Sequence, residues 1–130
     1  MPNLPYISEC EIIIDLIMHE MSIAVNIIDI AVETARKNNA FIINEIVLDI
    51  GTLSGIETES LLFCYDSACK NTIAEGSVLK LNIIAAKAVC DSCGFEFDAD
   101  SWAPRCPKCD NVVLMVSGGR ELKIKSINID

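Results

Sequence analysis

Two Cys-x-x-Cys pairs constrain the fold of this chain more than any other feature. The first pair is Cys90 and Cys93, the second is Cys106 and Cys109, and twelve residues separate them. Thiolates at this spacing can converge on one tetrahedral metal ion, and four of them leave no open coordination position. We therefore predict a structural Zn²⁺ site that holds a small lobe of the chain together.

Charge and cysteine content limit the classes of partner. The net charge of −9 over 130 residues would repel phosphate backbones, so we expect no nucleic-acid partner. No apolar run approaches the ~18 residues of a membrane helix, so we expect no membrane insertion. The chain has seven cysteines, and its first seventeen residues contain no Lys or Arg and so do not resemble a leader sequence. Together these features indicate the reducing cytoplasm. Cys10, Cys64 and Cys69 are then expected to be buried free thiols.

Apolar periodicity predicts two helices. The first runs from Ser22, as N-cap, to Lys37, and the second from Thr58, as N-cap, to about Lys70. The first helix has an apolar stripe of Ile23, Ala24, Ile27, Ile28, Ala31 and Ala35. The stripe of the second consists of Leu61, Leu62, Tyr65, Ala68 and Cys69. We expect both stripes to pack into one core.

Alternating apolar residues predict strands at 42–50, 79–84 and 121–130. The second strand leads directly into the cysteine pairs and the third follows them, so the zinc lobe is an insertion before the last strand. Alternation slips near Lys125 and Ser126, which predicts a β-bulge or a bend. The stretch 12–17 is also rich in β-prone isoleucine.

His19 is the only histidine, which restricts imidazole-dependent catalysis. No nucleophile elbow, phosphate loop or dinucleotide fingerprint accompanies it, so we do not expect an enzyme. Taken alone, His19 would be expected to be an ordinary surface or half-buried residue. If Met18 starts the chain, however, its amine, the His19 amide nitrogen and the imidazole Nδ1 form fused chelate rings, with Glu20 as a further donor. Such a nitrogen-rich set favours Ni²⁺ or Cu²⁺ over zinc.

Several short motifs follow one another along the chain, over about residues 18 to 130. They are Met18-His19-Glu20-Met21-Ser22, Gly51-Thr52-Leu53-Ser54-Gly55, Glu59-Ser60-Leu61, Thr72-Ile73-Ala74-Glu75-Gly76, both cysteine pairs and Gly119-Arg120-Glu121-Leu122. In their order and spacing these motifs resemble the HypA/HybF family of hydrogenase nickel-incorporation proteins.

The resemblance implies a nickel metallochaperone with an α+β fold: a small mixed sheet with two helices and an inserted four-cysteine zinc ribbon. Residues 18–86 with 117–130 would form the nickel-binding domain and residues 87–116 the zinc domain. Nickel would be bound by Met18 (through its amine), His19 and Glu20, and zinc by Cys90, Cys93, Cys106 and Cys109. Implied partners are the large subunit of [NiFe]-hydrogenase and a nickel-binding GTPase, and some members also serve urease.

Residues 1–17 depart from the family pattern, because they turn the Met18 amine into a peptide nitrogen. An upstream start chosen in error, a cleaved extension and a genuine extension are the three explanations. Two other functions also stay open from the cysteine pairs alone: a zinc-ribbon interaction module without cargo, and a rubredoxin-like iron electron carrier. The sequence leaves monomer and homodimer open, and Trp102 is expected to pack over the zinc turns.

Overall fold

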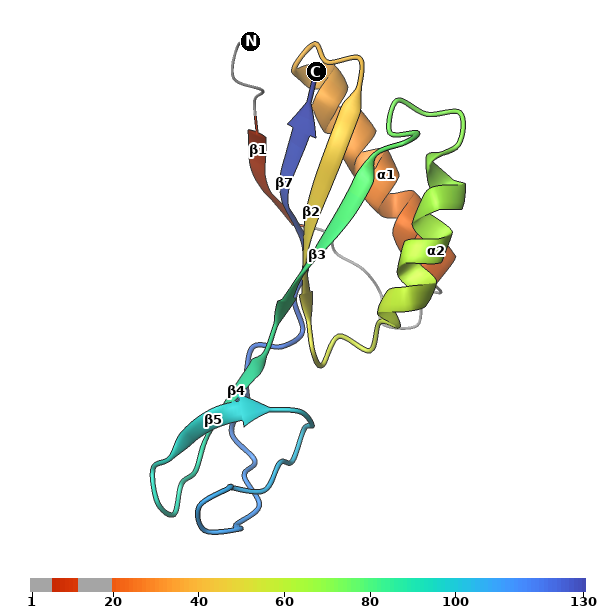
Figure 1. Cartoon of the computed structure of the whole chain (residues 1–130). Helices are drawn as coiled ribbons and strands as arrows, with labels where there is room; N and C mark the ends of the chain where they lie inside the picture. Colours follow the sequence, from red (N-terminus) through yellow and green to blue (C-terminus); the bar gives the residue numbers. More distant parts are fainter. Residues whose placement is uncertain (1–5, 12–19) are drawn as a thin grey trace. The chain divides into compact units, whose positions relative to one another are not determined.

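The structure is a computed structural model that describes residues 6–11, as backbone only, and residues 20–130 (Figure 1). The chain forms two compact units. Unit 1 contains the described residues up to Asp49, together with Ile56–Asn82 and Leu122–Asp130, and unit 2 contains Ile50–Gly55 and Ile83–Glu121. Unit 2 includes the range 87–116 that we expect for the zinc domain and extends past it on both sides.

Unit 1 is built on a four-stranded sheet in the order β1-β7-β2-β3. The strands are β1 (Tyr6–Glu11), β2 (Ile43–Gly51), β3 (Val78–Ile84) and β7 (Leu122–Ile129). The helices α1 (Glu20–Lys37) and α2 (Thr58–Cys69) lie side by side against this sheet (Figure 1). The predicted α+β class is confirmed. Within the described residues, no helix is long and apolar enough to cross a membrane.

Helix α1 buries the predicted stripe but begins earlier than predicted. All six residues of the stripe are buried. The helix already includes Glu20, so Ser22 lies inside the helix and the predicted N-cap is wrong. A carboxylate in the first turn is stabilised by the positive end of the helix dipole. The helix ends in a Schellman motif, in which Ala40 N donates to Ala35 O and Asn39, at φ 59°, takes the left-handed position.

Helix α2 has a narrower apolar face than its sequence indicates. Glu57 occupies the N-cap position without a side-chain hydrogen bond, so the predicted Thr58 cap is also wrong. The buried positions are Leu61, Tyr65 and Cys69, whereas Leu62 is 40% exposed. The Tyr65 hydroxyl shares a 2.5 Å hydrogen bond with Ser77 Oγ. Burial raises the pKa of Tyr65, so this phenol stays protonated in the core.

Strand β7 explains the slip in apolar alternation differently from our prediction. Its register against β1 is unbroken from Lys123 to Asn128, so there is no bulge on that side. Instead Ile127, Asn128 and Ile129 are all buried, which means that both faces of the strand are covered at this end. Asn128 remains satisfied there, because its Oδ1 accepts a 3.0 Å hydrogen bond from Asn44.

Unit 2 contains a small sheet in the order β5-β4-β6. Its strands are β4 (Ala86–Val89), β5 (Glu96–Ala99) and β6 (Val116–Ser117). The buried core consists of Ala86, Ala88, Cys90, Ala99, Cys106 and Val113. Four of these six side chains are alanine or valine and two are metal-ligand candidates. This core therefore buries little apolar surface of its own.

Candidate metal centre

Four cysteine sulfurs gather in unit 2. The Sγ atoms of Cys90, Cys93, Cys106 and Cys109 all lie within 4.8 Å of one another. Cys90 Sγ is 3.5 Å from Cys109 Sγ, and Cys93 Sγ is 3.6 Å from Cys106 Sγ. A regular tetrahedron with Zn–S bonds of ~2.3 Å has sulfur–sulfur edges of about 3.8 Å. The four thiols therefore fit a closed, structural zinc site.

Two equivalent turns present these cysteines. In the first turn Gly94 N donates to Cys90 O at 2.7 Å, and Cys90 N donates to Phe95 O at 2.9 Å. In the second, Asp110 N donates to Cys106 O at 2.8 Å, and Cys106 N donates to Asn111 O at 2.7 Å. The residue after each pair has a positive φ, 76° at Gly94 and 62° at Asp110.

The sequence pattern identified only one of these left-handed positions. Gly94 is recognisable because glycine adopts positive φ without steric cost, whereas Asp110 carries no such label. Aspartate does tolerate the left-handed region better than most residues. The usable signal was positional, since Asp110 follows the second pair as Gly94 follows the first.

Backbone N–H groups favour two of the four thiolates. Donation from Cys93 N and then Ser92 N lowers the pKa of Cys90 to about 7. Burial opposes ionisation of Cys106, but donation from Cys109 N and Lys108 N outweighs it and lowers that pKa as well. Because a metal ligand must be a thiolate, these two inner cysteines are prepared for an ion.

The other two cysteines retain their protons more strongly. Asn111 N donates to Cys109, but the hydrogen bond to Cys90 prevails and raises the pKa of Cys109 to about 12. Phe95 N donates to Cys93, yet burial and the neighbouring sulfurs raise the pKa of Cys93. Each pair thus contributes one buried cysteine whose pKa is lowered and one exposed cysteine whose pKa is raised. Zinc binding would displace the remaining protons.

Side chains outside the ligand set connect the two turns. Asn111 Nδ2 donates to Ser92 Oγ, and Lys108 Nζ lies 4.7 Å from the centroid of the Phe95 ring. The cysteine spacing does not predict these pairs, because their partners are distant in the chain. They join the two turns through contacts that do not involve the sulfurs.

Trp102 does not pack over the zinc turns as expected. Its side chain is 49% exposed, and the Arg120 guanidinium lies over its ring, 4.1 Å from the centroid. Both residues line an open hollow of about 460 Å³ in unit 2. The residues packed against the small core are instead Leu53, Phe95, Phe97 and Val116.

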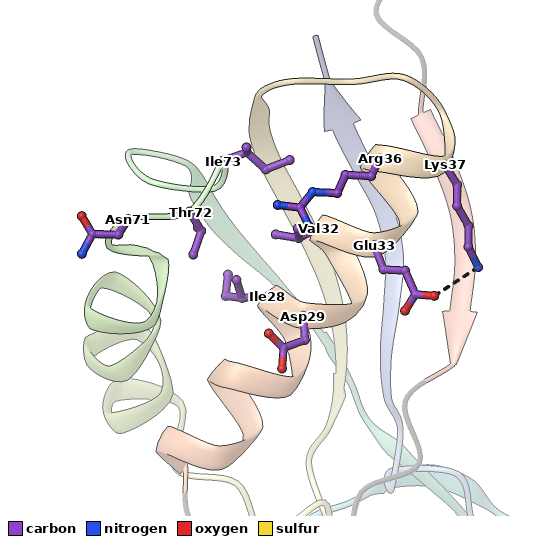
Figure 2. A pocket seen from close by; sticks show the side chains of 9 residues that line it. All are labelled: Ile28, Asp29, Val32, Glu33, Arg36, Lys37, Asn71, Thr72 and Ile73. Atoms are coloured by element: carbon purple, nitrogen blue, oxygen red, sulfur yellow. Dashed lines mark ion pairs between the residues drawn. The ribbon is translucent and has the colours of Figure 1, made fainter.

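The proposed nickel residues lie at the edge of the described structure. Met18 and His19 fall outside the described residues, and Glu20 is half-buried in the first turn of α1. A second hollow, of about 590 Å³, lies farther along α1 and is shown in Figure 2. Asp29 and Glu33 line it with Arg36 and Lys37, and Lys37 pairs with Glu33 at 3.2 Å. Over the described residues, the four cysteines are the only group of three or more metal donors.

Comparisons with known proteins match nearly the whole of this architecture. The family model described as "Hydrogenase/urease nickel incorporation, metallochaperone, hypA" matches residues 18–129. The hydrogenase maturation factor HypA of Chlorobium limicola is 45% identical over 87% of this chain and 97% of its own. The HypA of Chlorobaculum parvum is 40% identical over 87% of this chain and 100% of its own. The solution structure of the nickel metallochaperone HypA from Helicobacter pylori matches with a TM-score of 0.59 and 23% sequence identity. The match covers 86% of this chain and 97% of that chain, and it supports the fold alone.

The fold, the thiol cluster and the matches together define a nickel metallochaperone that also has a zinc site. The chain belongs to the HypA family and serves nickel incorporation in hydrogenase maturation.

Proposed function

We propose that Met18, His19 and Glu20 bind the Ni²⁺ cargo. The observation that carries this proposal is the start of the family match at residue 18, where the three residues stand together. Amine, amide and imidazole nitrogens form a planar donor set that suits Ni²⁺. Glu20 adds a carboxylate at the N-terminal end of α1. A donor set of three nitrogens and one carboxylate is expected to bind Ni²⁺ modestly, so that the cargo can be released.

Nickel titration of a chain beginning at Met18 tests this site. The variants His19→Ala and Glu20→Ala are compared with Glu33→Ala, which removes a 69% exposed carboxylate elsewhere on α1. We expect His19→Ala to lose at least about 10-fold in affinity, which corresponds to ~1.4 kcal/mol, and Glu33→Ala to match the parent. Equal nickel affinity in His19→Ala and the parent would show that nickel binds elsewhere. Weaker binding by the 130-residue chain would show that a free Met18 amine contributes.

We also propose that the four cysteines hold Zn²⁺ as a structural ion. The support is the mutual approach of their sulfurs and the closed donor set. A Cys109→Ser variant should bind zinc with an affinity at least about 100-fold lower than that of the parent. Replacing a residue that only contacts a ligand costs ~10–100-fold in metal affinity, and loss of a ligand should cost more. Zinc content under chelator competition measures this, with Cys64→Ser as a control away from the site. A red, redox-active protein containing iron would instead favour the rubredoxin-like alternative.

The proposed partners are the [NiFe]-hydrogenase large subunit and a nickel-binding GTPase, in the cytoplasm. The chain would act as a carrier without catalysing a reaction, with residues 18–86 and 117–130 as its nickel domain and 87–116 as its zinc domain. Urease is a second client class, because the family description names it. The test is to express the parent or His19→Ala in cells that lack the carrier and to measure the nickel content of the hydrogenase large subunit. The parent should restore the nickel content, and His19→Ala should not. Recovery by both would show that delivery of nickel does not require His19.

A further inference from the structure

Strand β1 covers one edge of the sheet in unit 1. It pairs antiparallel with β7 in a regular register that runs from Tyr6 opposite Asn128 to Glu11 opposite Lys123. In the sheet order β1-β7-β2-β3 it is the outermost strand on that side, as Figure 1 shows. Without β1, the outer backbone N–H and C=O groups of β7 would be unpaired.

This strand lies outside the part of the chain that matches the family. The family model begins at residue 18, and the 113 matched residues span the whole of the Chlorobaculum parvum relative. The two helices and β2, β3 and β7 therefore lie in the shared part, whereas β1 is an addition to it.

We propose that β1 is an intrachain edge cover that keeps the chain monomeric. When β1 is absent or displaced, the β7 edge pairs with β7 of a second copy of this chain. Both partners would use the same backbone groups of β7, so cover and dimer exclude each other. This proposal concerns the sheet edge and does not depend on which residues bind metal.

The sequence of β7 suits pairing with itself. Two antiparallel copies related by a twofold axis, with Ser126 opposite Ser126, place Lys125 opposite Ile127 and Lys123 opposite Ile129. No two lysines face each other directly, so the pairing carries no like-charge penalty. If β1 were absent, the eight-residue strand β7 would be long enough to act as a template.

Being part of the same chain gives β1 an advantage over a second copy. A segment joined by a short connection has an effective concentration of about 1 mM. Protein at about 50 μM is roughly 20-fold more dilute, so the intrachain cover wins while it is present. Removing it leaves the second copy as the available strand.

Sedimentation velocity under reducing conditions, with zinc-loaded protein up to about 200 μM, tests the proposal. The 130-residue chain and a control lacking only residues 1–5, which precede β1, should remain monomers. A chain beginning at Met18 should double its mass as concentration rises. A peptide of residues 1–17, added at about 1 mM, should return it to monomer, whereas a scrambled peptide should not. Equal masses for the three chains, or a dimer that the peptide leaves intact, would overturn the proposal.

A full-length variant guards against misfolding of the shortened chain. Backbone N–H groups alternate in direction along a strand, so one of residues 7 and 8 donates its N–H toward β7. Replacing both by proline, as Ile7→Pro with Ser8→Pro, therefore removes that donor whichever of the two residues supplies it. This variant should also dimerise, and hydrogen exchange at residues 123–128 should be slow in its dimer and at least about 10-fold faster after dilution to monomer. A monomer at all concentrations, or exchange independent of concentration, would again reject the edge-cover role.

Discussion

The four thiols of the metal centre lie in different local environments. Backbone donation lowers the pKa of Cys90 to about 7, so zinc-free folded protein retains the Cys90 thiolate at lower pH than an unfolded chain does. The stabilisation from this group is present above the ordinary thiol pKa of 9.0 and is lost as pH falls through about 7. Protons then compete with zinc for the same sulfur.

We therefore expect zinc retention to weaken on acidification. With a fixed excess of chelator, the zinc-bound fraction of the protein should fall as pH decreases from about 8 to about 5. A zinc-responsive dye measures the zinc that the protein releases. Replacing Cys64, a thiol outside the cluster, by serine should leave this profile unchanged. A pH-independent zinc-bound fraction would show that the thiols are not the ligands.

Gly51 permits a close backbone approach within unit 2. A Cβ placed on Gly51 would lie 2.0 Å from Gly119 O, and that carbonyl also accepts a 2.6 Å hydrogen bond from Leu53 N. Backbone atoms cannot move aside as a flexible side chain can. Gly51→Ala should therefore destabilise the protein by about 3 kcal/mol or more, the range of severe overpacking.

Gly55→Ala is the matched comparison for Gly51→Ala. Gly55 has a φ of 76°, and a Cβ added there would meet nothing within 4 Å. Its substitution therefore costs only the left-handed conformation, about 1–2 kcal/mol. Urea unfolding of both variants measures the difference. Equal losses of stability would mean that the contact with Gly119 is not a steric limit.

Helix α1 shows which features of an element are encoded in its own sequence. Its buried stripe was predictable residue by residue, because the helical period fixes which side chains share a face. The residue at which the helix begins was not predictable. A helix capped by Ser22 and a helix that already includes Glu20 differ in free energy by about 1 kcal/mol or less. On α2, periodicity placed Leu62 in the core, yet the width of the buried face depends on neighbouring elements.

The metal centre was predictable in part. The spacing of the cysteines predicted the four-thiol cluster, but it did not predict the Ser92–Asn111 and Phe95–Lys108 contacts.

The stripe on α1 makes a quantitative prediction. Ile27 is fully buried, whereas Val25 on the same helix is 41% exposed. Ile27→Ala should lower the free energy of unfolding by about 2–5 kcal/mol through lost burial and a cavity. Val25→Ala should change it by less than about 0.5 kcal/mol, because little apolar area is lost and alanine is the better helix former. Urea denaturation followed by helical circular dichroism distinguishes them, and similar losses would contradict the assigned face.

Over the whole molecule, the two units depend on different sources of stability. The described core of unit 1 contains large side chains, among them Ile27, Ile46, Leu48 and Tyr65. The core of unit 2 consists mainly of alanine, valine and cysteine. Small apolar cores seldom stabilise a fold of this size without a metal or a disulfide. Zinc binding is therefore expected to supply most of the folding free energy of unit 2.

Removing zinc should consequently unfold unit 2 and leave unit 1 folded. After chelation, amide signals of residues 86–117 should collapse toward random-coil positions in a ¹H–¹⁵N spectrum, while those of α1 and α2 should persist. The helical circular dichroism should change little, because both helices belong to unit 1. Readdition of Zn²⁺ should restore the spectrum, whereas Mg²⁺, which prefers oxygen ligands, should not. Dispersed, exchange-protected signals from β4 and β5 in the zinc-free protein would show that the small core is sufficient without the ion.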